Sequence, residues 1–379
     1  MNGAGARGKS GTSRPRPNLS LTELNNDDPM EQSFAIQNGH FIRGNIDVSE
    51  SGITRLDRQT QYHGLSAADV ELVKVIGKGM SSQVSLVRHR SGTLMALKVI
   101  NVYERTNREQ MFQEIATLYE ADCPALVGFY GAFFTECSIS IAVEYMDQGC
   151  LHSVIEKQGA IPEPAVAAIA YQALWGLGYL KHEKRVHRDV KPQNILCNSR
   201  GEVKLTDFGS SRDLENSVNV CQTFVGTFKY MSPERVQSQA YSYASDIWSL
   251  GLVILECLLG EFPYPDCNTY IDMVQTILEA PIPLPPANRF SPEFSDFIQC
   301  CLHKDPSQRV FPEFLIGAPW LTIHNVDSIP ISRTIVRAWL ESRGVRSNAT
   351  SPSPPPPPDR ARSYTRRLSA GLKNAVQAT

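Results

Sequence analysis

A short run near the middle of the chain carries the polar groups that phosphoryl transfer to a hydroxyl needs. It reads His187-Arg188-Asp189-Val190-Lys191-Pro192-Gln193-Asn194. A carboxylate can orient the attacking hydroxyl and accept its proton, and Asp189 fits that role. Lys191 is placed to neutralise charge on the transferring group, and Asn194 can hold a Mg²⁺ ion. We therefore expect Asp189 and Lys191 to be catalytic.

A second metal ligand and a buried cation are predicted on either side of this run. Asp207-Phe208-Gly209 follows Asn194 by thirteen residues, and its carboxylate is the principal predicted Mg²⁺ ligand. Upstream, Lys98 lies in an apolar strand, where an unpaired ammonium is costly, and Glu114 is the expected partner. On its own Lys98 would also suit a strand lysine that reaches solvent. The order and spacing of the segments make a chance match negligible.

A glycine-rich turn precedes Lys98. Gly77-Lys78-Gly79-Met80-Ser81-Ser82 lies between two predicted strands, which argues against a dinucleotide fold and a Walker loop. Glycines let backbone N–H groups approach the phosphates of ATP, although an ordinary hairpin turn would look similar. Ser82 stands where a third glycine is expected.

Apolar periodicity predicts the elements that position these groups. Period-two alternation from Val70 indicates five strands, and the stripe at Met111, Ile115 and Leu118 indicates one main helix. Beyond Gly149 the chain becomes mainly helical. We therefore expect an α+β fold over residues 70–321, with a small five-stranded lobe and a large helical lobe.

The flanking segments differ from this body in composition. Residues 1–69 show no sustained period and are predicted to be a mostly disordered arm. Residues 322–345 contain an amphipathic helix with Ile331, Ile335, Val336, Trp339 and Leu340 on one face. Residues 346–379 form a Pro-rich basic tail.

Bulk properties exclude several classes of protein. A net charge of −2 gives no reason to expect nucleic acid. No apolar run is long enough for a membrane span, and we expect no signal peptide, lipidation or membrane anchor. The nine Cys include no C-x-x-C pair, which indicates reduced thiols. We expect a cytoplasmic protein that could also enter the nucleus.

Taken in order, these motifs resemble the eukaryotic protein kinase signature. Further matches are Met231-Ser232-Pro233-Glu234, the segment 246–251, and Arg309 as a buried partner of Glu234. The resemblance implies the bilobal protein kinase fold, with ATP and Mg²⁺ as cofactors and with Asn194 and Asp207 as metal ligands. It also implies a stack of apolar and aromatic side chains between the lobes, made of Leu118, Phe129, His187 and Phe208. The ATP-binding residues that it implies are Ile76, Gly77, Gly79, Val84, Ala96, Lys98, Glu114, Val143, Glu144, Met146, Asn194 and Asp207.

A narrower resemblance lies in the activation segment. The run 224–235 resembles that of mitogen-activated protein kinase kinases, and Ser217 and Thr223 have the S/T-x5-S/T spacing of the plant-type branch. The resemblance implies dual-specificity phosphorylation of Thr and Tyr in a downstream mitogen-activated protein kinase. It also implies that an upstream mitogen-activated protein kinase kinase kinase activates this chain at Ser217 and Thr223.

Two further segments match the docking regions of that family. Residues 14–21 have the form of a docking peptide, in which basic residues precede a Leu-x-Leu pair. Its predicted contact residues are Arg14, Arg16, Leu19 and Leu21. Ala338-Trp339-Leu340 resembles the docking region that follows the catalytic domain. A random basic arm and a helix that simply packs on the large lobe are the simpler interpretations.

Two other functions remain open at this stage. A pseudokinase scaffold is disfavoured because Lys98, Glu114, Asp189, Asn194 and Asp207 are all present. A Ser/Thr kinase outside the cascade would also carry Lys191, so Tyr specificity depends on the family resemblance.

Overall fold

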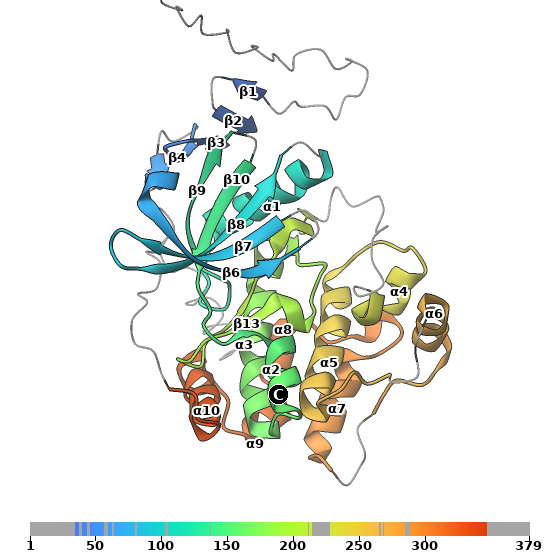
Figure 1. Ribbon diagram of the computed structural model, residues 1–379. Coiled ribbons are helices and arrows are strands. Elements are labelled where there is room, and N and C mark those ends of the chain that lie inside the picture. Colours follow the sequence, from blue (N-terminus) through green and yellow to red (C-terminus); the bar gives the residue numbers. More distant parts are fainter. Residues whose placement is uncertain are drawn as a thin grey trace, which may run out of the picture.

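The computed structural model describes residues 35–346, apart from 38–39, 44–45, 57–59, 63, 80–81, 103–104, 137, 211, 214–227, 265–266, 268 and 285–288. It shows a small lobe built on β-sheets above a large, mainly helical lobe (Figure 1). Among the described residues, none of the helices combines the length and apolar character needed to cross a bilayer.

The small lobe contains the expected five-stranded sheet. Its strands pair antiparallel in the order β6-β7-β8-β10-β9. They span Val70–Lys78 (β6), Ser82–His89 (β7), Leu94–Asn101 (β8), Phe129–Thr135 (β9) and Ser138–Glu144 (β10). The helix α1, Arg105–Glu120, packs against β8 and β9. Met111, Ile115 and Leu118 are buried, as their spacing predicts.

A second sheet in the N-terminal segment corrects one expectation. The disorder predicted for residues 1–69 is wrong for five described strands between residues 35 and 62, which form an antiparallel sheet in the order β1-β2-β3-β4-β5. The strands are Ala35–Gln37, His40–Arg43, Ile46–Ser49, Gly52–Arg55 and Thr60–Tyr62. This sheet lies beside β9 (Figure 1) and contributes buried apolar side chains to the core. Tertiary burial therefore orders a segment whose local pattern is weak.

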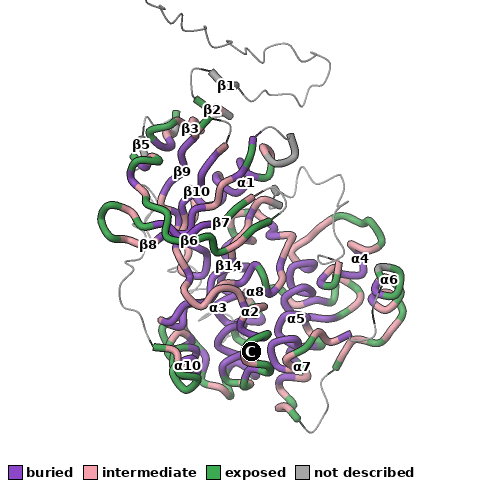
Figure 2. The backbone as a smooth tube through the Cα atoms, viewed as in Figure 1, coloured by how far each residue is buried: buried purple, intermediate pink, exposed green. Residues whose placement is uncertain are grey.

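The large lobe is built around two buried helices, α3 (Glu163–His182) and α5 (Tyr243–Leu259), which contact each other and are buried along most of their length (Figure 2). The α5 helix ends where Gly260 adopts φ 80° and donates its N–H to the carbonyl of Glu256 at 2.8 Å. The other helices are α2 (Leu151–Gln158), α4 (Pro233–Val236), α6 (Tyr270–Glu279), α7 (Pro292–Cys301), α8 (Pro312–Leu315), α9 (Pro319–Ile323) and α10 (Ile329–Ser342).

Short strands line the large lobe where it faces the small one. β11 (Gly149–Cys150), β13 (Ile195–Cys197) and β14 (Val203–Leu205) form one sheet, and β12 (Arg185–Val186) pairs with β15 (Arg212–Asp213). The segments with the predicted catalytic motifs enter or leave these strands.

The predicted C-terminal helix is present as α10 and packs on α3. Val336, Trp339 and Leu340 are buried, and Ile335 packs against the core. Ile331 differs from the expectation because 40% of it is exposed. A turn at Gly201, φ 79°, approaches α10 so closely that an added Cβ would lie 2.1 Å from the carbonyl oxygen of Arg333.

Candidate active site

Lys98 on β8 reaches two carboxylates from different elements. Its Nζ donates to both oxygens of Glu114 on α1, at 2.8 and 3.0 Å, and to Oδ1 of Asp207 at 3.2 Å. The predicted pairing of Lys98 with Glu114 is confirmed. Burial alone would lower the pKa of Lys98, but the charges of Glu114 and Asp207 raise it above the ordinary value. The amine therefore stays protonated, as phosphate binding requires.

Asp207 lies where the two lobes meet. Its backbone has φ 65°, an uncommon left-handed conformation for a residue other than glycine. The charge of Lys98 holds the pKa of the Asp207 carboxyl below its usual range. The side chain is thus an anionic carboxylate beside a fixed cation.

The catalytic loop brings three predicted residues together. Nδ2 of Asn194 donates to the backbone carbonyl and to Oδ2 of Asp189, both at 2.8 Å. Lys191 Nζ lies 2.8 Å from the same Oδ2. Two donors thus fix the Asp189 carboxylate in one orientation.

Asn194 and Asp207 are also held near each other. The backbone N–H of Thr206 donates to the carbonyl of Asn194 at 3.0 Å, and Ile195 pairs with Leu205 between β13 and β14. A carboxylate and the amide oxygen of Asn194 are the hard oxygen ligands that Mg²⁺ prefers. The donor set therefore fits the metal implied by the sequence.

Asp246 anchors the catalytic loop to α5. Its carboxylate accepts the backbone N–H groups of His187 at 2.8 Å and Arg188 at 2.9 Å. Arg188 has φ 72°, and these bonds hold that strained conformation. The sequence placed Asp246 in a family motif but did not indicate this contact.

Aromatic packing joins the two segments that carry the predicted metal ligands. The rings of His187 and Phe208 meet edge to face at 5.3 Å, and Nε2 of His187 lies 3.1 Å from the carbonyl of Thr206. Leu118 and Phe129, the other predicted members of the stack, are buried in the same apolar core. The contact between His187 and Phe208 is thus present, and α1, which carries Leu118, contacts residues 208–210. The complete four-residue stack stays a prediction.

The predicted ion pair between Glu234 and Arg309 is confirmed. Two guanidinium nitrogens of Arg309 donate to the two Glu234 oxygens, each at 2.7 Å. Both side chains are buried, and the guanidinium lies 5.1 Å from the ring of Trp248. This two-point contact joins the segment after the activation loop to the base of the large lobe.

Known sequences are similar over most of the chain. The sequence profile of the protein kinase domain matches residues 70–321. Mitogen-activated protein kinase kinase 3 of Arabidopsis thaliana is 44% identical over 292 residues, which cover 76% of this chain and 55% of that protein. Mitogen-activated protein kinase kinase SIPKK of Nicotiana tabacum is 41% identical over 328 residues, covering 82% and 92%. The dual specificity kinase dSOR1 of Drosophila melanogaster is 35% identical over 326 residues, covering 79% and 82%.

The chain belongs to the mitogen-activated protein kinase kinase family. It spans just over half the length of the Arabidopsis kinase 3 and almost all of the tobacco relative. As a protein kinase it uses ATP.

Strand register aligns the residues expected above the nucleotide of the kinase. Gly77 pairs with Val84, Val84 pairs with Lys98, and Ala96 pairs with Val143. Directly paired residues project to one face of a sheet, so these positions form a continuous surface next to the Lys98 ammonium. Ile76 is 40% exposed and Gly79 donates its N–H to the carbonyl of Ser82 at 2.7 Å, which closes the turn.

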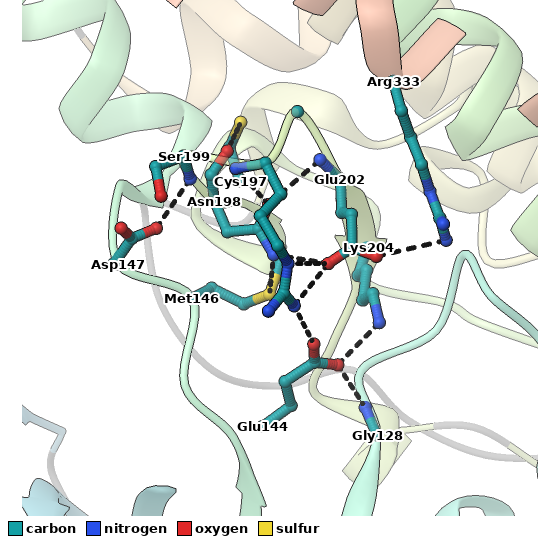
Figure 3. Close-up of polar contacts among 12 residues, drawn as sticks. Gly128, Glu144, Met146, Asp147, Cys197, Asn198, Ser199, Glu202, Lys204 and Arg333 are labelled. Atoms are coloured by element: carbon teal, nitrogen blue, oxygen red, sulfur yellow. Dashed lines mark hydrogen bonds and ion pairs between the residues drawn. The ribbon is translucent and has the colours of Figure 1, made fainter. Parts of the chain in front are cut away.

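Residues 144–146 form the hinge of the kinase, between β10 of the small lobe and β11 of the large lobe. The side chain of Glu144 in this hinge binds other protein groups and is not available to the nucleotide. The buried carboxylate of Glu144 accepts from Lys204 at 2.6 Å, from Arg200 at 3.1 Å and from the N–H of Gly128 at 3.3 Å (Figure 3). These three donors hold the carboxylate, so any contact of Glu144 with ATP belongs to its backbone. The sulfur of Met146 lies 3.8 Å from Nδ2 of Asn198.

Sequence reasoning missed the polar network below this hinge. Glu202 accepts from Asn198 and Arg200, each at 2.6 Å, and lies 3.3 Å from Arg333 on α10 (Figure 3). Burial alone would raise the pKa of Glu202, but the charge of Lys204 and the hydrogen bonds of Asn198 and Arg200 lower it to about 2. The chain Glu144–Arg200–Glu202–Arg333 thus connects the hinge with the C-terminal helix. Alternating charges at Arg200, Glu202 and Lys204 were the only sequence signal.

Several predicted functional residues lie outside the described residues. They are the activation-segment residues Ser217 and Thr223 and the docking residues Arg14, Arg16, Leu19 and Leu21.

Proposed function

We propose that this kinase phosphorylates Thr and Tyr in the activation loop of a downstream mitogen-activated protein kinase. The observation that carries the proposal is the complete set of five residues in two hydrogen-bonded groups. Lys98 binds Glu114 and Asp207, and Asn194 binds Asp189. A scaffold that performs no chemistry has no need of such a set. The family of the relatives supports the choice of substrate.

Each residue of the set has a proposed role. Asp189 orients the substrate hydroxyl and accepts its proton, while Lys191 offsets charge on the phosphoryl group. Lys98 binds the ATP phosphates, and Glu114 holds it in place. When bound, Mg²⁺ neutralises the phosphates, and its proposed ligands are Asp207 and Asn194.

The remaining predicted residues surround the nucleotide in this proposal. Gly77 and Gly79 cover the phosphates, and apolar side chains of Ile76, Val84, Ala96 and Val143 enclose the adenine. The backbone of residues 144–146 forms hydrogen bonds to its edge.

We further propose that phosphorylation at Ser217 and Thr223 by an upstream kinase of the cascade switches the enzyme on. A phosphate adds roughly −1.5 to −2 charge and strong acceptors, which suits pairing with a nearby guanidinium. Arg188 supports this proposal because it is adjacent to Asp189 and its backbone is fixed by Asp246. Pairing there would couple the activation segment to the catalytic carboxylate.

The decisive experiment uses radiolabelled ATP, an inactivated downstream kinase as substrate, and phosphosite mapping. We expect labelled Thr and Tyr in the activation loop of the substrate. No transfer after activation would support a scaffold, and label only on Ser or on unrelated sites would support a Ser/Thr kinase outside the cascade.

We propose that the N-terminal peptide 14–21 docks the substrate. Replacing Arg14, Arg16, Leu19 and Leu21 by Ala should raise KM for the cognate kinase and leave turnover of a generic substrate unchanged. If neither parameter changes, the peptide takes no part in recognition.

A further inference from the structure

The N-terminal sheet touches the helix that carries Glu114. Phe41 on β2 is fully buried, and its ring lies parallel to that of Phe112 on α1, with 5.0 Å between centroids and 13° between planes. The same ring lies 6.1 Å from Phe134 on β9, at 12°. Phe41 therefore joins α1 to the edge strand of the small-lobe sheet.

The two faces of α1 have different partners. Phe112 and Glu114 are two residues apart, which corresponds to about 200° around a helix with 3.6 residues per turn. One face therefore directs Glu114 to Lys98, and the nearly opposite face presents Phe112 to Phe41. Phe112 lies about 60° from Ile115, on the flank of the apolar stripe opposite to Glu114, and its exposed fraction is only 4%.

The rest of the sheet fastens Phe41 in place. Val48 on β3 pairs with Ile53 on β4, and both side chains are buried in the same core as Phe112 and Phe134. Both strands contact β9, beside which they lie in Figure 1. The sheet is thus anchored on β9, a strand of the small-lobe sheet, and Phe41 extends from it to the helix.

We propose that Phe41 is a positioning residue for phosphoryl transfer, through which the sheet of residues 35–62 holds α1 where Glu114 pairs with Lys98. A segment that packs better against one position of a helix than against another shifts the helix toward the first position. The size of the shift is set by the difference between the two packing free energies. Here the preferred position is the one that fixes the Lys98 ammonium beside Asp207. The N-terminal sheet is then part of the catalytic unit.

The first test measures binding of a non-hydrolysable ATP analogue with Mg²⁺ to Phe41→Ala in the full chain. Because the apparent affinity falls with the fraction of molecules that are competent to bind, we expect a loss of about tenfold or more. KM for the protein substrate should be unchanged. Phe41→Leu keeps a large apolar side chain and should keep most of the affinity. If Phe41→Ala unfolds at the assay temperature, Phe41→Val provides the same comparison.

A second background separates positioning from general support. If Phe41 acts through Glu114, Phe41→Ala should not weaken analogue binding further in a chain that already carries Glu114→Ala. The Lys98–Glu114 pair is then already absent. An equal loss in both backgrounds would overturn the proposal.

Ile53→Ala is the matched control. It removes an equally buried side chain from the same sheet, on a strand that contacts β9. We expect it to lower the melting temperature but to leave the analogue affinity of the folded chain near that of wild type. A loss of affinity equal to that of Phe41→Ala would show that the sheet only stabilises the lobe.

This inference rests on the proposed kinase function, but its failure is distinguishable. Inability of the wild-type chain to phosphorylate a mitogen-activated protein kinase would reject the proposed function. Equal analogue affinities for wild type and Phe41→Ala would reject the positioning role alone.

Discussion

Glu202 should make folding of the kinase sensitive to acid within a defined pH window. Its pKa is lowered from an ordinary value of 4.5 to about 2 in the folded state. A carboxyl with a depressed pKa stabilises the fold above its unfolded pKa and loses that contribution as the pH falls toward the folded pKa. The shift corresponds to about 3 kcal/mol at pH 7, of which about 1.4 kcal/mol should be lost by pH 3.5.

The measurement compares wild type with Glu202→Gln, which keeps the shape of the side chain but cannot ionise. Urea unfolding, followed by the fluorescence of the four tryptophans, gives the free energy of unfolding at each pH from 7 to 3.5. The difference between the two proteins should be largest at neutral pH and shrink below pH 4.5. Glu341→Gln is a suitable control because this carboxylate on α10 is 53% exposed and carries the same charge. Its pH profile should follow that of wild type.

A constant difference between wild type and Glu202→Gln over this range would contradict the reasoning. It would mean that Glu202 titrates alike in the folded and unfolded chains. The Lys204 charge and the hydrogen bonds of Asn198 and Arg200 would then only offset the cost of burial.

Three further predictions concern the catalytic set, its support and its switch. Lys98→Met and Asp189→Asn should each lower phosphoryl transfer on the order of a thousandfold while circular dichroism and the melting temperature show a folded chain, and wild-type rates would refute the site. Arg309→Ala leaves Glu234 buried and unpaired, so it should cost about 3–5 kcal/mol in urea unfolding; a loss below about 1 kcal/mol would mean that the pair is solvated. Ser217→Ala combined with Thr223→Ala should abolish stimulation by an activating upstream kinase, and stimulation equal to wild type would exclude these residues as the switch.

Motif residues could be predicted because burying a charged side chain costs free energy unless a specific partner is present. A lysine inside an apolar strand needs a carboxylate, and Glu114 was the acid on the right flank of the following helix. The α5 helix also follows directly from its sequence, because a long apolar run ends at a glycine. In both cases local pattern and tertiary contact favour the same structure.

The N-terminal sheet could not be predicted with the same rule. Its strands have three or four residues, and the buried side chains Phe41, Val48 and Ile53 are spread over three of them. Such strands are stable only because β9 and α1 cover one face, and that contact is invisible in the local pattern. The direction of the Glu144 side chain was missed for a similar reason, since Arg200 and Lys204 lie far along the chain.

The N-terminal sheet and α10 lie outside the kinase motifs, and each contacts a different part of the active site. Lys98 and Glu114 come from the small lobe and Asp189 from the large one, so catalysis depends on both the position of α1 and the relation between the lobes. The N-terminal sheet contacts α1 directly, whereas α10 reaches the hinge through Arg333 and Glu202. A charge removed at Glu202 should therefore lower stability and alter hinge geometry while leaving the Lys98–Glu114 pair formed. A ring removed at Phe41 should also lower stability, but it should weaken the Lys98–Glu114 pair and leave the hinge network formed. Because the described contacts of Glu202 and Phe41 involve different residues, their effects on unfolding free energy should add when both are changed.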